Sequence, residues 1–165
     1  AKIDNIDKKD RLIMCLTGDG ELCEGSNWEA LLTIQSRKLN NMVLVVNRNH
    51  QFTIGRTDCT ETQRDICLDP IDKKLESFSF ETRIIDGHSF PTIFEGFSDI
   101  RTRISDKPLA VILDTEKGHG SPVFAGKRMW HYRVPQNPEL NQIRLDLENE
   151  WLTLKNEYSL IKGDN

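Results

Sequence analysis

The sequence is poor in the features that mark several special classes of protein. It has no apolar run near the roughly 20 residues that a membrane-spanning helix needs. It has no internal repeat and no low-complexity tract, and we expect no secretory signal peptide. Its 22 basic residues are outnumbered by 26 acidic ones, and the net charge of −4 gives no basic face for nucleic acid. We therefore expect a globular protein that binds neither membrane nor nucleic acid.

Cysteine is also scarce, and its spacing does not suit a metal. The four cysteines, Cys15, Cys23, Cys59 and Cys67, contain no Cys-x-x-Cys pair, which argues against a zinc site. Cys15 falls inside a predicted core strand. We expect all four to be reduced thiols in a cytoplasmic protein.

What the sequence does contain is an alternation of strand and helix patterns. Its 165 residues are 37% hydrophobic and 29% charged, enough for one domain with a substantial core. Four runs are nearly continuous in apolar or β-branched residues, as in strands covered on both faces. The predicted strands are residues 12–17, 42–47, 80–86 and 109–114. The pattern predicts an α/β fold, with a parallel sheet and helices on both faces.

Capping signals and apolar spacing predict three helices. The first begins at Ser26, which forms a capping-box pattern with Glu29. The second has Pro91 in its first turn, and the third begins near Pro138. The apolar side chains at helical spacing are expected to pack in the core. They are Trp28, Leu31, Leu32 and Leu39 in the first helix, Ile93, Phe94, Phe97, Ile100 and Ile104 in the second, and Leu140, Ile143, Leu147, Trp151 and Leu154 in the third.

The remaining segments bear on domain organisation. Residues 51–70 and 115–135 lack periodicity, and long irregular segments at the carboxyl edge of a parallel sheet are where ligand groups gather. We expect residues 1–165 to form a single domain, with a frayed tail at 160–165. A short polar lead, residues 2–10, runs almost directly into a strand. We therefore expect the chain to be part of a larger protein or one component of a split one.

The most informative motif is Gly18-Asp19-Gly20 together with Asn49. The triplet follows the first predicted strand and Asn49 closes the second, so a crossover helix would bring Asp19 and Asn49 side by side. Taken alone, Gly-Asp-Gly is also a common turn in which aspartate caps a helix. A carboxylate and an amide oxygen form half of a site for a hard divalent cation. Magnesium commonly draws its other ligands from phosphates and water, so this site predicts a ligand that carries a diphosphate. Gly20 would let the backbone approach that diphosphate closely.

The residues between these two points resemble a known family. Residues 18–30 (GDGELCEGSNWEA) and 38–49 (KLNNMVLVVNRN) closely resemble the thiamine-diphosphate motif of transketolases. The resemblance continues through Ile85-Asp86-Gly87-His88 to Trp130-His131, and covers about residues 11–150 in order. It implies a thiamine-diphosphate-binding fold, of which the chain would be the C-terminal portion of the diphosphate-binding (PP-type) domain, incomplete at its N-terminus.

The resemblance also implies a site and an activity. Asp19 and Asn49 look like side-chain ligands of Mg²⁺ or Ca²⁺, with Gln51 offering its backbone carbonyl. The resemblance implies that five residues contact thiamine diphosphate: Gly18, Asp19, Gly20, Asn49 and His131. His131 also looks like the family histidine that reaches the substrate. Glu24 looks like the glutamate of a carboxylate network across a dimer interface. The implied reaction moves a two-carbon ketol unit from a ketose phosphate to an aldose.

The implied site is incomplete in this sequence. In the family, the aminopyrimidine ring and its activating glutamate belong to a pyrimidine-binding domain, which nothing in this chain resembles. We therefore expect a partner domain or subunit that binds the pyrimidine ring, in a homo- or hetero-oligomer, and no turnover by this chain alone.

Four alternatives remain open at this point. Two are other thiamine-diphosphate enzymes, of the deoxyxylulose-phosphate synthase and 2-oxo-acid dehydrogenase types, although Glu21, Glu24 and the Trp28-Glu29-Ala30 run favour transketolase. The third is a non-catalytic subunit that serves assembly or regulation. The fourth is an unrelated metal-dependent phosphatase, which would need more acidic residues at the strand ends.

Overall fold

Four parallel strands form one sheet in the computed structural model, which describes residues 11–59 and 65–162. The elements in chain order are β1 (Ile13–Gly18), the short 3-10 helix η1 (Gly20–Cys23), α2 (Gly25–Ser36), β2 (Met42–Arg48), β3 (Gln51–Phe52), β4 (Gly55–Arg56), α3 (Ile71–Ser77), β5 (Glu81–Asp86), α4 (Phe90–Phe97), β6 (Leu109–Asp114), the 3-10 helix η2 (Arg128–His131) and α5 (Glu139–Lys162). All four predicted strands are present, and none of their ends differs from the predicted residue by more than one.

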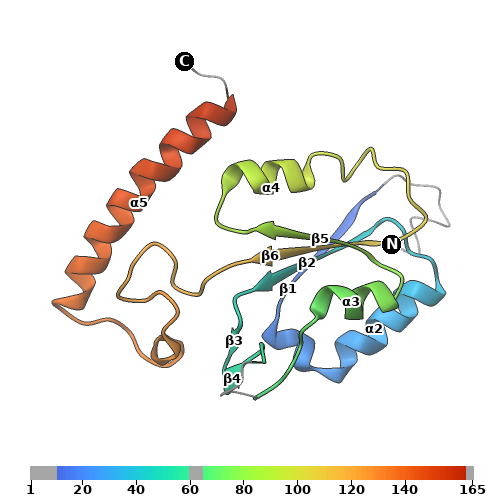
Figure 1. Ribbon diagram of the computed structural model, residues 1–165, viewed down its shortest axis with the longest axis horizontal. Coiled ribbons are helices and arrows are strands. Elements are labelled where there is room, and N and C mark those ends of the chain that lie inside the picture. The colour runs from blue at the N-terminus through green and yellow to red at the C-terminus, as the bar shows by residue number, and fades with distance from the viewer. Residues whose placement is uncertain (1–10, 60–64, 163–165) are drawn as a thin grey trace.

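The strand register brings the carboxyl ends of the strands to one edge of the sheet. The strand order is β1-β2-β6-β5, and every neighbouring pair is parallel. Gly18 pairs with Asn47, Arg48 pairs with Asp114, and Asp114 pairs with Asp86. Polar residues that follow the four strands are therefore gathered along the same edge. Beyond β2, the short antiparallel hairpin of β3 and β4 extends from this edge (Figure 1).

Helices cover both faces of the sheet, as the sequence predicted. Helices α2 and α3 lie against one face and α4 against the other (Figure 1). The α2 and α3 side holds the larger core cluster, and the α4 side holds a smaller one because a single helix packs there. The larger cluster comprises Leu22, Leu31, Leu44, Val46, Leu68, Ile71, Leu75, Phe80, Ala110 and Ile112, and the smaller one Val43, Val45, Leu109 and Val111.

Strand β1 differs from the prediction of a buried core strand. Cys15 and Met14 are exposed, and the side chain of Leu16 is 70% exposed. The reason lies in the strand order, because β1 ends the sheet and pairs only with β2 among the described strands. An edge strand has neighbours on one flank only, so its apolar composition does not by itself bury it.

The first two predicted helices begin or end at other residues than expected. Helix α2 begins at Gly25 with Glu24 as its N-cap, and no side chain of the cap bonds the first turn. The predicted capping box of Ser26 and Glu29 is therefore wrong. Helix α4 ends at Phe97, so Ile104 lies beyond it and is fully exposed. Helix α3 was not predicted, because a seven-residue helix is too short for a clear period.

The third predicted helix is present as α5, but its apolar stripe is mostly not buried. Helix α5 stands away from the sheet, beyond the carboxyl ends of the strands (Figure 1). Ile143 is buried, whereas Leu147 is exposed and Trp151 is 63% exposed. The helix reaches Lys162, so part of the expected frayed tail is helical. Residues 163–165 and the polar lead at 2–10 lie outside the described residues.

Two of the four expected thiols are joined in a disulfide. Cys59 and Cys67 are bonded, with their Cα atoms 5.2 Å apart, a separation within the range of disulfides. The N–H groups of Ile66 and Leu68 donate to the carbonyls of Arg56 and Thr57, which brings the two cysteines together although they are eight positions apart. Cys15 and Cys23 are free thiols, as predicted. Among the described helices, none has the length and apolar character needed to cross a membrane.

Candidate functional site

The carboxylate of Asp19 is buried at the end of β1. Asp19 follows the last residue of the strand and caps η1, where its Oδ1 accepts a hydrogen bond from the backbone N–H of Gly20 at 2.9 Å. Its own N–H donates to the carbonyl of Asn47 at 3.1 Å, which fixes the turn against β2. The residue is 1% exposed. A buried carboxylate requires donors around it, because desolvation of an unpaired charge is costly.

The turn after β2 supplies one of those donors. His50 has a left-handed backbone with φ of 62°, and its N–H donates to Asp19 Oδ2 at 2.7 Å. In the same turn, the N–H of Gln51 donates to Asn49 Oδ1 at 3.0 Å. The structure therefore places the Asp19 and Asn49 turns next to each other, as the crossover topology predicted.

Thr57 supplies a further donor that the sequence did not reveal. It follows β4, is 3% exposed, and its hydroxyl donates to Asp19 Oδ2 at 2.6 Å. Thr57 lies in the segment that lacked any periodicity, so no pattern in the sequence pointed to it. Only the hairpin of β3 and β4 brings it back to the end of β1.

The two glycines of the motif have structural uses in this fold. Gly18 ends β1, and its N–H donates to the carboxylate of Glu21 at 2.7 Å. Beside Gly20, a Cβ atom would lie 2.5 Å from the Cβ of Phe52. Glycine is required there so that the turn can pack on β3. Phe52 therefore occupies the space that a side chain at Gly20 would need, and a contact between Gly20 and a diphosphate stays a prediction.

A cleft of about 340 Å³ opens beside these residues, and the ends of β2, β5 and β6 all contribute to it. It is lined by Asn49, His50, Gln51, Arg56, His88, Asp114, Thr115, Glu116 and Gly126. Most of these residues were not predicted from the sequence to belong to a binding site. Asp114, Thr115 and Glu116 could have been found by the rule that identified Asn49, because they are polar residues at the end of an apolar strand.

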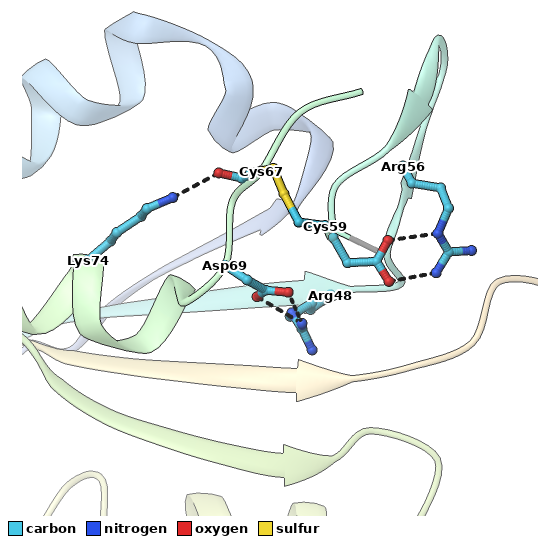
Figure 2. The surroundings of a disulfide bond; sticks show 7 residues. Arg48, Arg56, Cys59, Cys67, Asp69 and Lys74 are labelled. Atoms are coloured by element: carbon cyan, nitrogen blue, oxygen red, sulfur yellow. Dashed lines mark hydrogen bonds and ion pairs between the residues drawn. A yellow bond between two sulfur atoms is a disulfide. The ribbon is translucent and has the colours of Figure 1, made fainter. Parts of the chain in front are cut away.

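Ion pairs hold the rim of the cleft. Arg48 donates to both carboxylate oxygens of Asp69, at 2.8 and 2.7 Å, as Figure 2 shows, and to Asp114 at 3.2 Å. The Nε2 atom of His50 lies 2.9 Å from Asp114 Oδ1. Arg56 forms a two-pronged pair with Asp58, and this arginine lowers the pKa of the Asp58 carboxyl. These pairs fix the side chains that surround the Asn49 turn.

His131 lies at the end of η2, in the loop between β6 and α5. Two hydrogen bonds tie this loop to the hairpin: Gln51 Nε2 donates to the carbonyl of Gly126 at 2.9 Å, and Arg128 donates to that of Ile54 at 2.6 Å. Burial lowers the pKa of the His131 imidazole, and the charges of Lys117 and Arg128 lower it further. The imidazole therefore favours its neutral form near pH 7, in which one nitrogen can accept a proton.

Glu24 is not among the residues that line the cleft. It is the exposed N-cap residue of α2, and its side chain does not cap the helix. The site formed by Asp19, Asn49 and Gln51 does not include it. A role for Glu24 across an interface stays a prediction.

Unsatisfied polar atoms gather at this edge of the sheet. Four buried side-chain atoms have no hydrogen-bond partner in the described part of the chain. Two of them, His50 Nδ1 and Gln51 Oε1, belong to residues that line the cleft, and a third, His131 Nδ1, lies at the end of η2. Buried polar atoms are nearly always paired, so such atoms indicate a place for a polar ligand. Within residues 11–59 and 65–162, no group of three His, Cys, Asp or Glu residues could hold a metal by itself. A cation at Asp19 and Asn49 would therefore need ligand oxygens from a bound molecule.

The fold and this site define a class of protein. Parallel α/β sheets with a polar cleft at the carboxyl ends of the strands bind ligands at that edge. Comparison with known families makes the assignment specific. The family model described as "Transketolase, thiamine diphosphate binding domain" matches residues 2–154. The chain belongs to this family.

Individual relatives agree with the family. The chain is 38% identical over 141 residues to a protein of Actinobacillus succinogenes that is named as one of the subunits of an apulose-4-phosphate transketolase, a match that covers 85% of this chain and 48% of that protein. It is 34% identical over 132 residues to human transketolase, covering 79% of this chain and 20% of that protein. The chain thus spans about half of the first relative and a fifth of the second.

A solved structure supports the fold. The crystal structure of transketolase from Campylobacter jejuni superposes with a TM-score of 0.63 at 22% identity, over 96% of this chain and 28% of that one. At this identity the match concerns the fold alone. The thiamine-diphosphate-binding fold expected from the sequence is confirmed.

Proposed function

We propose that this chain supplies the metal- and diphosphate-binding half of a transketolase-type active site. The reaction would transfer a two-carbon ketol unit from a ketose phosphate to an aldose, with thiamine diphosphate and Mg²⁺ or Ca²⁺ as cofactors. The observation that carries the proposal is the buried Asp19 carboxylate, held beside the Asn49 turn by the N–H of His50. In this proposal the chain is the C-terminal portion of a PP-type domain.

Each residue of the site would have its own role in binding the cation or the diphosphate. Asp19, Asn49 and the backbone carbonyl of Gln51 would bind the cation, and the cation would hold the diphosphate. A carboxylate and neutral oxygens suit Mg²⁺, which accepts its remaining ligands from phosphates and water. The Gly18-Asp19-Gly20 turn would bind the diphosphate through the cation. Thiamine diphosphate, when bound, supplies the carbon nucleophile and electron sink of the reaction.

His131 would act near the substrate. Its neutral imidazole can accept a proton from a sugar hydroxyl, and its unpaired Nδ1 is available to a bound group. The loop that carries it is fastened to the hairpin beside the cation site by Gln51 and Arg128. This tie would keep the histidine at a constant position relative to the diphosphate. Glu24 would join a carboxylate network at the interface with a second protomer.

The site requires a partner that binds the pyrimidine ring. The chain spans about half of a relative that is itself named as one of the subunits of a transketolase, which supports a split enzyme completed by another polypeptide or domain. The same relative is named for apulose 4-phosphate. A ketose phosphate of that kind is the first donor to test.

The proposal is tested by calorimetric titration of thiamine diphosphate into the complete enzyme, with and without Mg²⁺. We expect binding only in the presence of the metal. Asp19→Asn removes the negative charge that Asp19 offers the cation, and should weaken metal-dependent binding by at least about 100-fold, because loss of a residue that only supports a ligand already costs about 10- to 100-fold. Asp106→Asn, at an exposed aspartate outside the site, serves as the control. Binding of equal strength without metal would refute the assigned roles of Asp19 and Asn49.

A further inference from the structure

The two oxygens of the Asp19 carboxylate are not equivalent. Oδ1 accepts one hydrogen bond, from the N–H of Gly20. Oδ2 accepts two, from the N–H of His50 at 2.7 Å and the hydroxyl of Thr57 at 2.6 Å. A carboxylate oxygen has about two lone-pair positions, so Oδ2 is fully occupied while Oδ1 keeps one position free.

Thr57 is held rigidly where it makes this contact. Its N–H donates to the carbonyl of His50 at 3.1 Å, and its carbonyl accepts from the N–H of Leu68 at 2.9 Å. The residue is buried and β-branched, so its side chain has few alternative rotamers. Its hydroxyl position is therefore set by the backbone on both sides.

The segments around Thr57 are fastened as well. Arg56 pairs with Asp58 through two hydrogen bonds of 2.7 Å each, and the Cys59–Cys67 disulfide closes the segment that follows. On the far side of the disulfide, Lys74 Nζ donates to the carbonyl of Cys67 at 2.8 Å (Figure 2). These contacts keep the segment that carries Thr57 close to the end of β1.

We infer that Thr57 is a positioning residue for the metal ligand Asp19: its hydroxyl occupies Oδ2 and so directs Oδ1 toward the cation. This inference rests on the proposed function, since it assumes that Asp19 binds a divalent cation. Thr57 itself touches neither metal nor cofactor. Its effect passes through the orientation of one carboxylate, as hydrogen-bonding partners of metal ligands do in other sites.

The test compares substitutions of Thr57 in the complete enzyme, using Mg²⁺ affinity at saturating thiamine diphosphate as the readout. Thr57→Val keeps the shape of the side chain and removes the donor, and should weaken Mg²⁺ binding by about 10- to 100-fold. Thr57→Ser restores the donor and should restore most of the affinity. If Thr57→Val does not fold, Thr57→Ala, which adds no bulk, takes its place. The matched control is Thr82→Val, which also removes a threonine–carboxylate hydrogen bond, here to Glu76 at 2.9 Å, away from the site.

The outcomes separate this inference from the proposed function. Loss of Mg²⁺ affinity in Thr57→Val, recovery in Thr57→Ser and no loss in Thr82→Val support it. A Thr57→Val protein that melts at lower temperature but binds Mg²⁺ as tightly as the parent overturns it, because Thr57 would then serve the fold alone. If the unsubstituted enzyme binds the cofactor without any metal, the proposed function fails first and this inference with it.

Discussion

At the scale of single residues, the site depends on how buried polar atoms are paired. Asp19 is fully enclosed and has three donors, whereas His131 Nδ1 and Gln51 Oε1 are buried without a partner among the described residues. The three donors hold the carboxylate in one orientation, and under the proposed function the unpaired atoms would contact a ligand. Such a division is typical of a binding site, because unpaired buried atoms reduce stability unless something binds them.

His131 provides the residue-scale prediction. His131→Ala should lower ketol transfer by about 100-fold, the low end of what a positioned acid or base contributes, and should reduce Mg²⁺-dependent cofactor affinity much less. Steady-state kinetics and calorimetry on the complete enzyme measure the two effects. Asp106→Asn, at an exposed aspartate outside the site, is the control. An equal loss of transfer and of cofactor affinity would instead give His131 a structural or diphosphate-binding role.

At the scale of elements, the hairpin of β3 and β4 does most to assemble the site. It carries Gln51 at its start and Thr57 just after its end, and its Phe52 packs against the Gly20 turn. Two strands of two residues each have little stability of their own. Their position depends on contacts with the end of β1 and with the loop before α5.

The contact between Gly20 and Phe52 gives the element-scale prediction. Gly20→Ala would put a Cβ 2.5 Å from the Cβ of Phe52, and should destabilise the protein by about 1–3 kcal/mol, as overpacking does. Gly25→Ala meets no atom within 4 Å at the start of α2 and should be neutral or slightly stabilising. Denaturant unfolding of both variants measures these changes in the free energy of unfolding. Combining Gly20→Ala with Phe52→Gly, which removes the Cβ that the new methyl group meets, should recover part of the loss, and full additivity of the two changes would contradict the contact.

At the scale of the whole molecule, a histidine pair joins the sheet to the loop and to α5. The rings of His88 and His119 stack with centroids 3.6 Å apart. His88 Nε2 accepts the N–H of Glu116 at 2.7 Å, and His119 Nε2 lies 3.1 Å from the carboxylate of Glu150 in α5. The pair therefore connects the end of the sheet, the loop after β6 and the helix that stands away from the sheet (Figure 1).

This pair predicts how stability depends on pH. Burial, and then the neighbouring His119, lowers the pKa of His88 in the folded state, against about 6.5 in the unfolded chain. Below that value the unfolded chain binds a proton that the folded state resists, so stability is lost as the pH falls from about 6.5 through the lowered pKa. His88→Gln keeps an acceptor for the N–H of Glu116 but does not titrate. Its free energy of unfolding, measured from pH 7 to pH 5, should fall less steeply than that of the parent, and an equal slope would exclude this role for His88.

The sequence by itself determined the sheet, the family and the proximity of the Asp19 and Asn49 turns. Apolar runs specify parallel strands because both faces of the inner strands are buried, and the Gly18-Asp19-Gly20 turn and Asn49 follow those strands directly. Whatever is close in sequence to a strand end could therefore be placed. Tertiary structure alone decided that β1 is an exposed edge, that Phe52 fills the space beside Gly20, that Cys59 and Cys67 are joined, and that Thr57 reaches Asp19. These features depend on contacts between segments far apart in the chain or on irregular turns. Neither produces a periodic pattern of apolar residues in the sequence.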